Sequence, residues 1–181
     1  MTVGDNVPGT DADGPGFQMV GIPDGLGTYK SGRDTFTVLM NHELRAEPAQ
    51  GITRDHGAVG AFVSKWTIDE DTLEVVAGED LIKQVVLAPE GVYGAPQKGV
   101  VLGRLCSGDL AQRSAFHHAR SGKGYRCRLY LNGEEVGNEG RAFAHALDGT
   151  SYELPYLGKD ELGERRGQSR YKRQDRRRRP R

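Results

Sequence analysis

The sequence has only two cysteines, Cys106 and Cys127, among its 181 residues. Two cysteines exclude a disulfide scaffold of the kind that supports small secreted domains, although one bridge or two free thiols remain open. No apolar run approaches the roughly 18 residues of a membrane-spanning helix, so no membrane span is expected. The first residues, "MTVGDNVPGTDADGPGF", carry neither an apolar run nor an early positive charge, so no secretory signal is predicted there.

Motifs of several catalytic classes are also absent. There is no Walker phosphate loop, no GxSxG nucleophile elbow, no CxxC pair and no HExxH zinc motif. The five histidines are not spaced as a metal-binding set, so they are predicted to be ordinary polar residues. The stretch "SGKG" (121–124) is short and rich in turn residues, which predicts a hairpin turn rather than a phosphate-binding loop.

A formal net charge of zero conceals two regions of opposite charge. Residues 165–181 contain nine Arg and one Lys against one acid, Asp175, which gives +9. The other 164 residues hold 15 basic and 24 acidic residues, which gives −9. A region with surplus carboxylates suits cations better than nucleic acid. Nucleic-acid binding is therefore expected only as non-specific binding by the basic tail.

The C-terminal tail, residues 160–181, is predicted to be disordered. After "ELPYLGK", the stretch "ERRGQSRYKRQDRRRRPR" has no aliphatic residue at all. One interpretation is an arm that binds RNA or another anion. The other, which we favour, is an out-of-frame or truncated end without a selected function, because a folded domain does not end within a repeat unit.

Short stretches that suit β-strands alternate with loops rich in Gly, Pro and Asp, which predicts an all-β fold. The nine residues "GIPDGLGTY" (21–29) contain three Gly, one Pro and one Asp and predict a tight turn. Residues 108–120 could form a helix of about three turns with Asp109 as its cap. Strands are predicted at about 35–40, 59–68, 72–77, 84–88, 98–105, 125–131, 141–147 and 151–154.

An internal repeat is the most informative pattern. Residues 31–43 and 121–135 both begin Ser-Gly-basic, continue through a β-rich stretch and end Asn-x-Glu. Residues 60–75 and 140–154 both continue from Gly through Ala-Phe to a strand, an Asp turn and a second strand. Because the two pairs occur in the same order, we interpret them as a true repeat, which is typical of propellers and solenoids.

The repeat predicts an incomplete β-propeller of about one and a half blades with long loop insertions. One unit supplies about four strands, which is the content of one propeller blade. A blade needs a neighbour on each face, and propellers close with about 4 to 8 blades. The predicted organisation is a flexible N-terminal segment (1–18), a partial propeller (19–159) and the basic tail (160–181).

The sequence also resembles a known family. The stretches that carry the resemblance are "GIPDGLGTY", "VLMNHEL", "GAFVSKWTID", "LCSGDLA", "YLNGEE" and "GRAFAHALDGTSYELPYLGK". In this order, over about residues 17–159, they are similar to the N-terminal part of the PhoX-type alkaline phosphatases. The resemblance implies a propeller with a central site that holds iron and calcium ions and hydrolyses phosphate monoesters. It also suggests exported relatives, while the localisation of this chain stays open.

The resemblance implies a set of candidate metal ligands. The Asn-His-Glu segment that ends in Glu43 is similar to a family segment that brings an acidic ligand to the channel. Cys106 and the pair Glu134–Glu135 are the nearest matches to the family's iron-binding cysteine and acid pair, with Asp109 as a further candidate. The chain departs from the family between Cys106 and the acid pair, where residues 107–132 replace a shorter, aromatic-rich stretch.

The repeat suggests how two of these acids meet. Glu43 and Glu134 end matching strands, so they are predicted to line one channel although they are far apart in sequence. Glu135 faces the other way, because adjacent strand residues point to opposite faces.

Each candidate ligand also has a simpler interpretation. The glutamates could accept turn hydrogen bonds or face solvent, and Cys106 could be a small buried residue. Asp109 could cap a helix, and Asn41 and Asn132 could shape turns.

These observations lead to two functional hypotheses. The first is a metal-dependent phosphate monoester hydrolase of the PhoX-like type, with a small phosphate monoester as substrate and metal-bound water as the attacking group. The second is a non-catalytic propeller-fragment protein that binds calcium or a partner through its loops.

Overall fold

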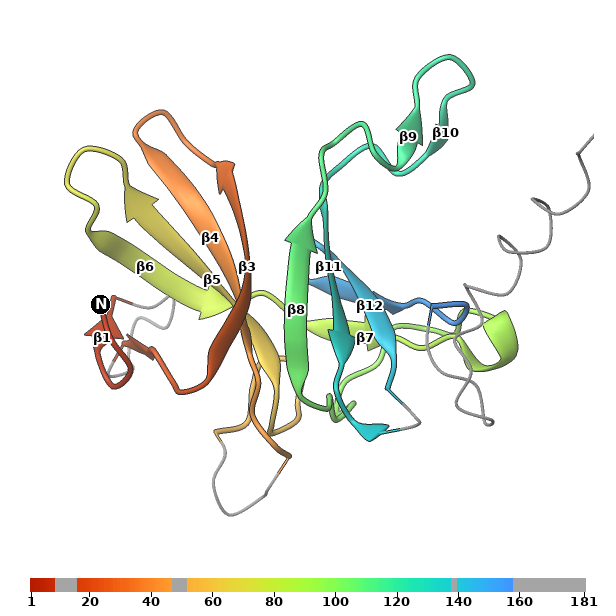
Figure 1. Ribbon diagram of the computed structural model, residues 1–181, viewed down its shortest axis with the longest axis horizontal. Helices are drawn as coiled ribbons and strands as arrows, with labels where there is room; N and C mark the ends of the chain where they lie inside the picture. The colour runs from red at the N-terminus through yellow and green to blue at the C-terminus, as the bar shows by residue number, and fades with distance from the viewer. Residues whose placement is uncertain (9–15, 47–51, 138–139, 158–181) are drawn as a thin grey trace, which may run out of the picture.

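The computed structural model describes residues 1–8, 16–46, 52–137 and 140–157. The predicted all-β fold is confirmed, since these residues form strands and turns and no α-helix (Figure 1). Two large sheets dominate, and among the described residues neither closes on itself. The predicted disordered tail lies outside the described residues.

The first sheet is a four-stranded antiparallel meander in the order β3-β4-β5-β6. One face of this sheet contributes Leu39 and Val63 to the core against the second sheet, and the other packs Trp66 against Val7 and Met19. Phe62, Ser64 and Trp66 alternate along β5 and are all buried. The strands are β3 (Pro23–Lys30), β4 (Thr35–His42), β5 (Phe62–Asp69) and β6 (Val75–Asp80).

The second sheet has five strands in the order β7-β13-β12-β11-β8. Strands β8, β11, β12 and β13 are antiparallel to their neighbours, and β7 joins the outer edge parallel to β13. The strands are β7 (Gln84–Val86), β8 (Leu105–Leu110), β11 (Leu129–Glu134), β12 (Ala142–Ala146) and β13 (Thr150–Glu153).

Three short elements complete the described chain. Strands β1 (Asn6–Val7) and β2 (Phe17–Gln18) pair beside β6, and β9 (His117–His118) pairs with β10 (Lys123–Gly124). A single 3-10 turn spans Pro89–Gly91. In the described part of 1–18, buried Val7 packs with Met19 and Trp66 in a small second core.

The main core lies between the two sheets. Residues of both sheets meet there, and ten of them are buried in one cluster. They are Leu39, Ala61, Val63, Leu81, Ile82, Val85, Leu102, Leu105, Tyr130 and Phe143.

The strand order agrees with the internal repeat. The similar segments 31–43 and 121–135 contain β4 and β11, each the second strand of an antiparallel four-strand set. The similar segments 60–75 and 140–154 contain the third strands, β5 and β12, and reach the fourth strands, β6 and β13. The two sheets therefore repeat one local topology, with β3 and β8 as the first strands.

Several sequence predictions of local structure are wrong, among them the strand at 98–105, of which only Leu105 lies in a strand. Residues 108–120 form no helix, because β8 continues through Asp109 to Leu110 and a hairpin follows. Asp109 is consequently an exposed strand residue and not a helix cap. The stretch 21–29 is no tight turn, since most of it belongs to β3.

The glycines of β3 serve close packing rather than a turn. Neither Gly25 nor Gly27 has a positive φ. A Cβ at Gly25 would clash with the backbone N and Cα of Gly108 in β8, and a Cβ at Gly27 would clash with Leu110. Glycine therefore allows β3 and β8 to approach backbone to backbone where the sheets meet (Figure 1).

Replacing Gly25 tests this close approach. We expect Gly25→Ala to lower the free energy of unfolding by about 1–3 kcal/mol, because the added methyl group must push the two backbones apart. Urea denaturation followed by tryptophan fluorescence measures the change. Gly21→Ala is the matched control, because a Cβ there meets no atom within 4 Å. Equal effects of both substitutions would contradict the packing argument.

Candidate functional site

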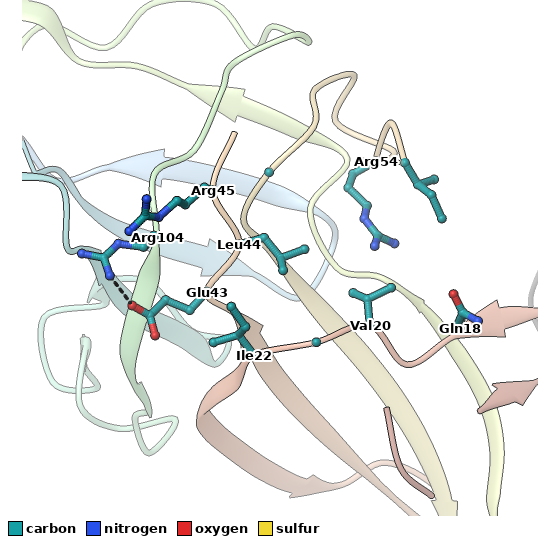
Figure 2. A pocket seen from close by; sticks show the side chains of 11 residues that line it. Gln18, Val20, Ile22, Glu43, Leu44, Arg45, Arg54 and Arg104 are labelled. Atoms are coloured by element: carbon teal, nitrogen blue, oxygen red, sulfur yellow. Dashed lines mark hydrogen bonds and ion pairs between the residues drawn. The ribbon is translucent and has the colours of Figure 1, made fainter. Parts of the chain in front are cut away.

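A pocket of about 590 Å³ opens at the end of β4, beside the residues that precede β8 (Figure 2). It contains three arginines and one glutamate, so its charged side chains sum to +2 (3 − 1). Asp80 and Glu135, which do not line the pocket, pair with Arg54 and Arg104 and offset part of this charge. The lining residues are Gln18, Val20, Gly21, Ile22, Glu43, Leu44, Arg45, Ile52, Arg54, Gly60 and Arg104.

Arg104 is held at one side of the pocket by two glutamates. Its Nη1 donates to Glu43 Oε1 at 3.2 Å, and its Nη2 donates to the backbone oxygen of Glu135 at 3.0 Å. The Glu135 carboxylate adds an ion pair at 3.5 Å. Glu43 is largely shielded from solvent, with a side chain that is 16% exposed. The guanidinium of Arg104 is thus oriented while it stays in contact with the pocket (Figure 2).

Arg54 forms a second, more rigid cation. Its guanidinium carbon lies 3.6 Å from the centre of the Phe62 ring, and that ring stacks on His42 at 4.3 Å. Asp80 lies 3.6 Å from Arg54 Nη1 in an ion pair in which both side chains are buried. Burial lowers the pKa of Arg54, although an arginine stays charged at any physiological pH. The third cation, Arg45, is exposed and follows β4 directly.

Among the predicted metal ligands, Glu43 is the one that lines this pocket. Glu134 lies nearby but is fully occupied by other partners. Its Oε1 accepts from Gly103 N (2.7 Å) and Arg141 Nη2 (2.6 Å), and its Oε2 accepts from Arg141 N (2.9 Å) and Arg141 Nε (2.8 Å). These four hydrogen bonds use the four lone-pair positions of the carboxylate, and the side chain is only 1% exposed.

Glu43 and Glu134 are brought near one another, as the repeat predicts, because they contact the adjacent residues Arg104 and Gly103. They do not converge on one point, since each carboxylate is bound by a different arginine. The repeat predicts that both glutamates line one channel, but of the two only Glu43 lines the pocket, and the contacts do not support a shared role as ligands.

The other predicted ligands also lie apart. Cys106 is half-buried, with Sγ at 3.9 Å from both Ser107 Oγ and Gly133 O, and Asp109 is exposed. Glu135 is mostly exposed and bound to Arg104. In the described part of the chain, no group of three or more His, Cys, Asp or Glu residues could hold a metal ion. The described residues therefore do not fit the calcium and iron centre that the resemblance implies.

A buried polar network joins the two sheets at the repeated asparagines. Asn132 Nδ2 donates to Asn41 Oδ1 at 3.0 Å, so equivalent residues of the two repeats bind each other across 91 positions of sequence. Asn41 Nδ2 donates to Cys106 O at 2.6 Å, and the Tyr130 hydroxyl donates to Gly25 O at 2.6 Å. Both asparagines lie within strands, so the prediction that they shape turns is wrong.

The network continues to a histidine that sequence reasoning treated as unremarkable. His145 Nε2 lies 2.8 Å from Asn132 Oδ1, and His145 Nδ1 lies 2.6 Å from Ser151 Oγ. Because the amide oxygen can only accept, Nε2 carries the proton and Nδ1 accepts from the serine. Burial lowers the pKa of His145 to about 3, so the ring is neutral. Both ring nitrogens of His145 have hydrogen-bond partners, so we interpret it as a structural residue.

Sequence reasoning missed the arginines that define the pocket. Arg45, Arg54 and Arg104 belong to loops outside every motif, and no regular spacing connects them. Only Arg45 could have been found from the sequence, because it lies two residues after the predicted ligand Glu43. Arg54 reaches the pocket from the loop between β4 and β5, and Arg104 contacts Glu43 only because the two sheets pack together.

No family model matches the chain, and searches of curated proteins and of solved structures return no similar protein. Among the described residues, no helix is long and apolar enough to cross a membrane.

Proposed function

We propose that this chain binds a small phosphate monoester in the pocket lined by Arg45, Arg54 and Arg104. The observation that carries the proposal is that three arginines and a single glutamate line one pocket. Guanidinium groups donate paired hydrogen bonds to phosphate oxygens, and their positive charge complements the double negative charge of a phosphate monoester. A neutral ligand offers no such complementary charge.

The pocket is partly organised before a ligand arrives. Stacking on Phe62 fixes the plane of Arg54, and Glu43 with Glu135 fixes Arg104. A fixed donor loses little conformational entropy on binding. Arg45 is exposed and free of such partners among the described residues, so it would close on the ligand from the open side.

We further propose that the two sheets are neighbouring blades of a β-propeller. Support comes from the repeated strand order, from the contact between the first strands β3 and β8, and from the Asn41–Asn132 hydrogen bond. Propellers place blades face to face in this way and bind ligands near the inner strands. The pocket lies beside β8 and the end of β4, close to this inner side.

Hydrolysis of the bound ester, with calcium and iron as the resemblance to PhoX-type phosphatases implies, stays a prediction. The arginine pocket accounts for binding of the phosphate group without such ions. We therefore favour binding over catalysis as the activity of the described residues.

Isothermal titration calorimetry with phenyl phosphate tests the proposal. We expect the wild-type chain to bind phenyl phosphate, and Arg104→Gln to weaken the affinity about tenfold or more, because a charge-assisted hydrogen bond to phosphate contributes about 1.5–3 kcal/mol. Phenol, which lacks the phosphate group, should give no binding heat.

Arg33→Gln is the matched control, since the Arg33 side chain is 95% exposed and lies outside the pocket. It should leave the affinity for phenyl phosphate unchanged. Equal losses for both arginine variants, or no binding by the wild type, would contradict the proposal. Turnover of p-nitrophenyl phosphate with added calcium and iron would instead support the hydrolase prediction.

A further inference from the structure

The most basic part of the described chain is a hairpin that the proposed function does not use. Residues 111–128, which we call the basic hairpin, connect β8 to β11 and contain the short strands β9 and β10. The hairpin projects beyond the end of the second sheet, away from the first sheet (Figure 1). Nearly all its residues are exposed. Its surface is therefore available to a partner.

The charge of the basic hairpin is opposite to that of its surroundings. It contains five cationic residues and no acid, whereas the rest of residues 1–164 holds ten basic and 24 acidic residues. None of the five takes part in an ion pair within the described residues. The cationic residues are Arg113, Arg120, Lys123, Arg126 and Arg128.

Two aromatic residues lie opposite each other on one face of the hairpin. The backbone N–H of Tyr125 donates to Phe116 O at 2.9 Å, which continues the pairing of His118 with Lys123. Opposed residues and residues two apart share a face of an antiparallel ribbon. Phe116, Tyr125, His118 and Lys123 therefore occupy one face, and the two aromatic side chains are 38% and 36% exposed.

The imidazole of His118 is oriented by the turn that follows it. Its Nδ1 lies 2.8 Å from Ser121 Oγ and also accepts from Ser121 N at 3.3 Å. Nδ1 is therefore the acceptor, and the ring proton belongs on Nε2. The aromatic face thus presents three flat rings together with the ammonium group of Lys123.

We propose that the basic hairpin binds single-stranded nucleic acid. Unpaired bases stack on exposed aromatic rings, and flanking Arg and Lys side chains neutralise the phosphates. A duplex keeps its base faces covered, so it can use the cations but not the rings. The expected preference is for single strands over duplexes. This surface is separate from the phosphate monoester pocket and does not depend on it.

The composition of the hairpin tip argues against an anionic membrane as the partner. The turn consists of Ala119, Arg120, Ser121 and Gly122, which include no large apolar side chain. Segments that enter the membrane interface carry Trp, Phe or Leu on the inserted side. The two aromatic residues here lie at the base of the hairpin and not at its tip.

Fluorescence anisotropy with a labelled oligouridine of about 12 nucleotides tests the proposal with the full chain. We expect R120S/K123S to weaken binding at low salt about tenfold. The slope of log affinity against log salt should fall by about 1.4, which is about 0.7 for each of two phosphates. We expect F116A/Y125A to weaken RNA binding about fivefold or more, with unchanged binding to inorganic polyphosphate, which offers no base to stack.

The matched control is R33S/K98S, which removes two exposed cations outside the hairpin. All variants retain residues 165–181, so a difference between them is due to the hairpin and not to the basic tail. A loss by R33S/K98S equal to that by R120S/K123S would overturn the proposal. A preference for duplex RNA would also overturn it, as would an equal loss of RNA and polyphosphate binding by F116A/Y125A. Binding to phosphatidylserine vesicles without binding to RNA would overturn it as well. Circular dichroism melting curves confirm that each variant is folded.

Discussion

Lowering the pH from 7 to 5 is expected to remove much of the free energy of unfolding. Three fully buried histidines cause this sensitivity, because the folded protein holds them neutral. Burial lowers the pKa of His42 and of His56 to about 4, and that of His145 to about 3. His42 and His145 have hydrogen-bond partners suited to a neutral ring, whereas neither ring nitrogen of His56 has a partner among the described residues.

The direction follows from the protons that each state binds. In the unfolded chain these histidines bind protons below about pH 6.5, but in the folded protein they do so only below about pH 4. The contribution of these neutral rings to the free energy of unfolding is therefore fully present above about pH 6.5, and it is lost as the pH drops toward 4. Each histidine contributes a slope of about 1.4 kcal/mol per pH unit in this window. Asp80 opposes the trend, since burial raises the pKa of its carboxyl group.

Urea denaturation at several pH values measures this dependence. His56→Leu should reduce the slope of the unfolding free energy against pH by about 1.4 kcal/mol per pH unit, which corresponds to one proton. It should not destabilise the protein at pH 7, because it replaces two unpartnered polar atoms by apolar ones. His118→Gln is the control, since it replaces an exposed histidine. A stability that stays constant between pH 7 and 5 would contradict the assignment of neutral buried rings.

Removal of the Glu134 carboxylate is expected to cost about 3–5 kcal/mol of stability. Glu134→Ala removes a carboxylate that is only 1% exposed, and it leaves the partly exposed guanidinium of Arg141 and the backbone N–H of Gly103 without this acceptor. Arg141 also lies over the Phe143 ring at 5.2 Å, so its displacement would disturb the core. Thermal and urea unfolding at pH 7 should both show the loss.

The same substitution separates a structural role from the metal-ligand role that the resemblance implies. If the carboxylate is structural, its removal lowers the free energy of unfolding by the same amount with and without added calcium and iron. Glu135→Ala is the matched control, because the Glu135 carboxylate is 60% exposed and should cost at most about 1 kcal/mol. If Glu134→Ala is harmless without metal and destabilising only when metal is added to the wild type, the structural assignment is wrong.

The strands were the most predictable part of the fold. Runs such as 35–40 and 59–68 carry β-branched and aromatic residues, and both became central strands. The edge strand β3 was mistaken for a turn, because the same glycines that permit a turn also permit close approach of two backbones. The helix at 108–120 was predicted from local spacing, but pairing of β8 with β11 overrides that preference.

The candidate site was predictable in part. The Asn-x-Glu repeat marked Asn41 and Asn132, which bind each other directly, and Glu43 and Glu134, which contact the adjacent residues Arg104 and Gly103. It did not indicate that an arginine occupies each carboxylate. Arg104 and Arg141 are not part of the Asn-x-Glu pattern, so their pairing depends on where the loops run between strands.

Taken alone, the amino-acid sequence determined the all-β class, the repeated strand order and the opposite charges of the acidic region and the basic tail. These properties depend on alternation, turn residues and composition, which are local. Only the tertiary structure decided which polar groups meet, including the arginine pocket, the occupied Glu134 and the asparagine pair. The Arg104–Glu43 and Asn132–Asn41 contacts join residues 61 and 91 positions apart, and their formation depends on how the two sheets pack, which no local pattern encodes.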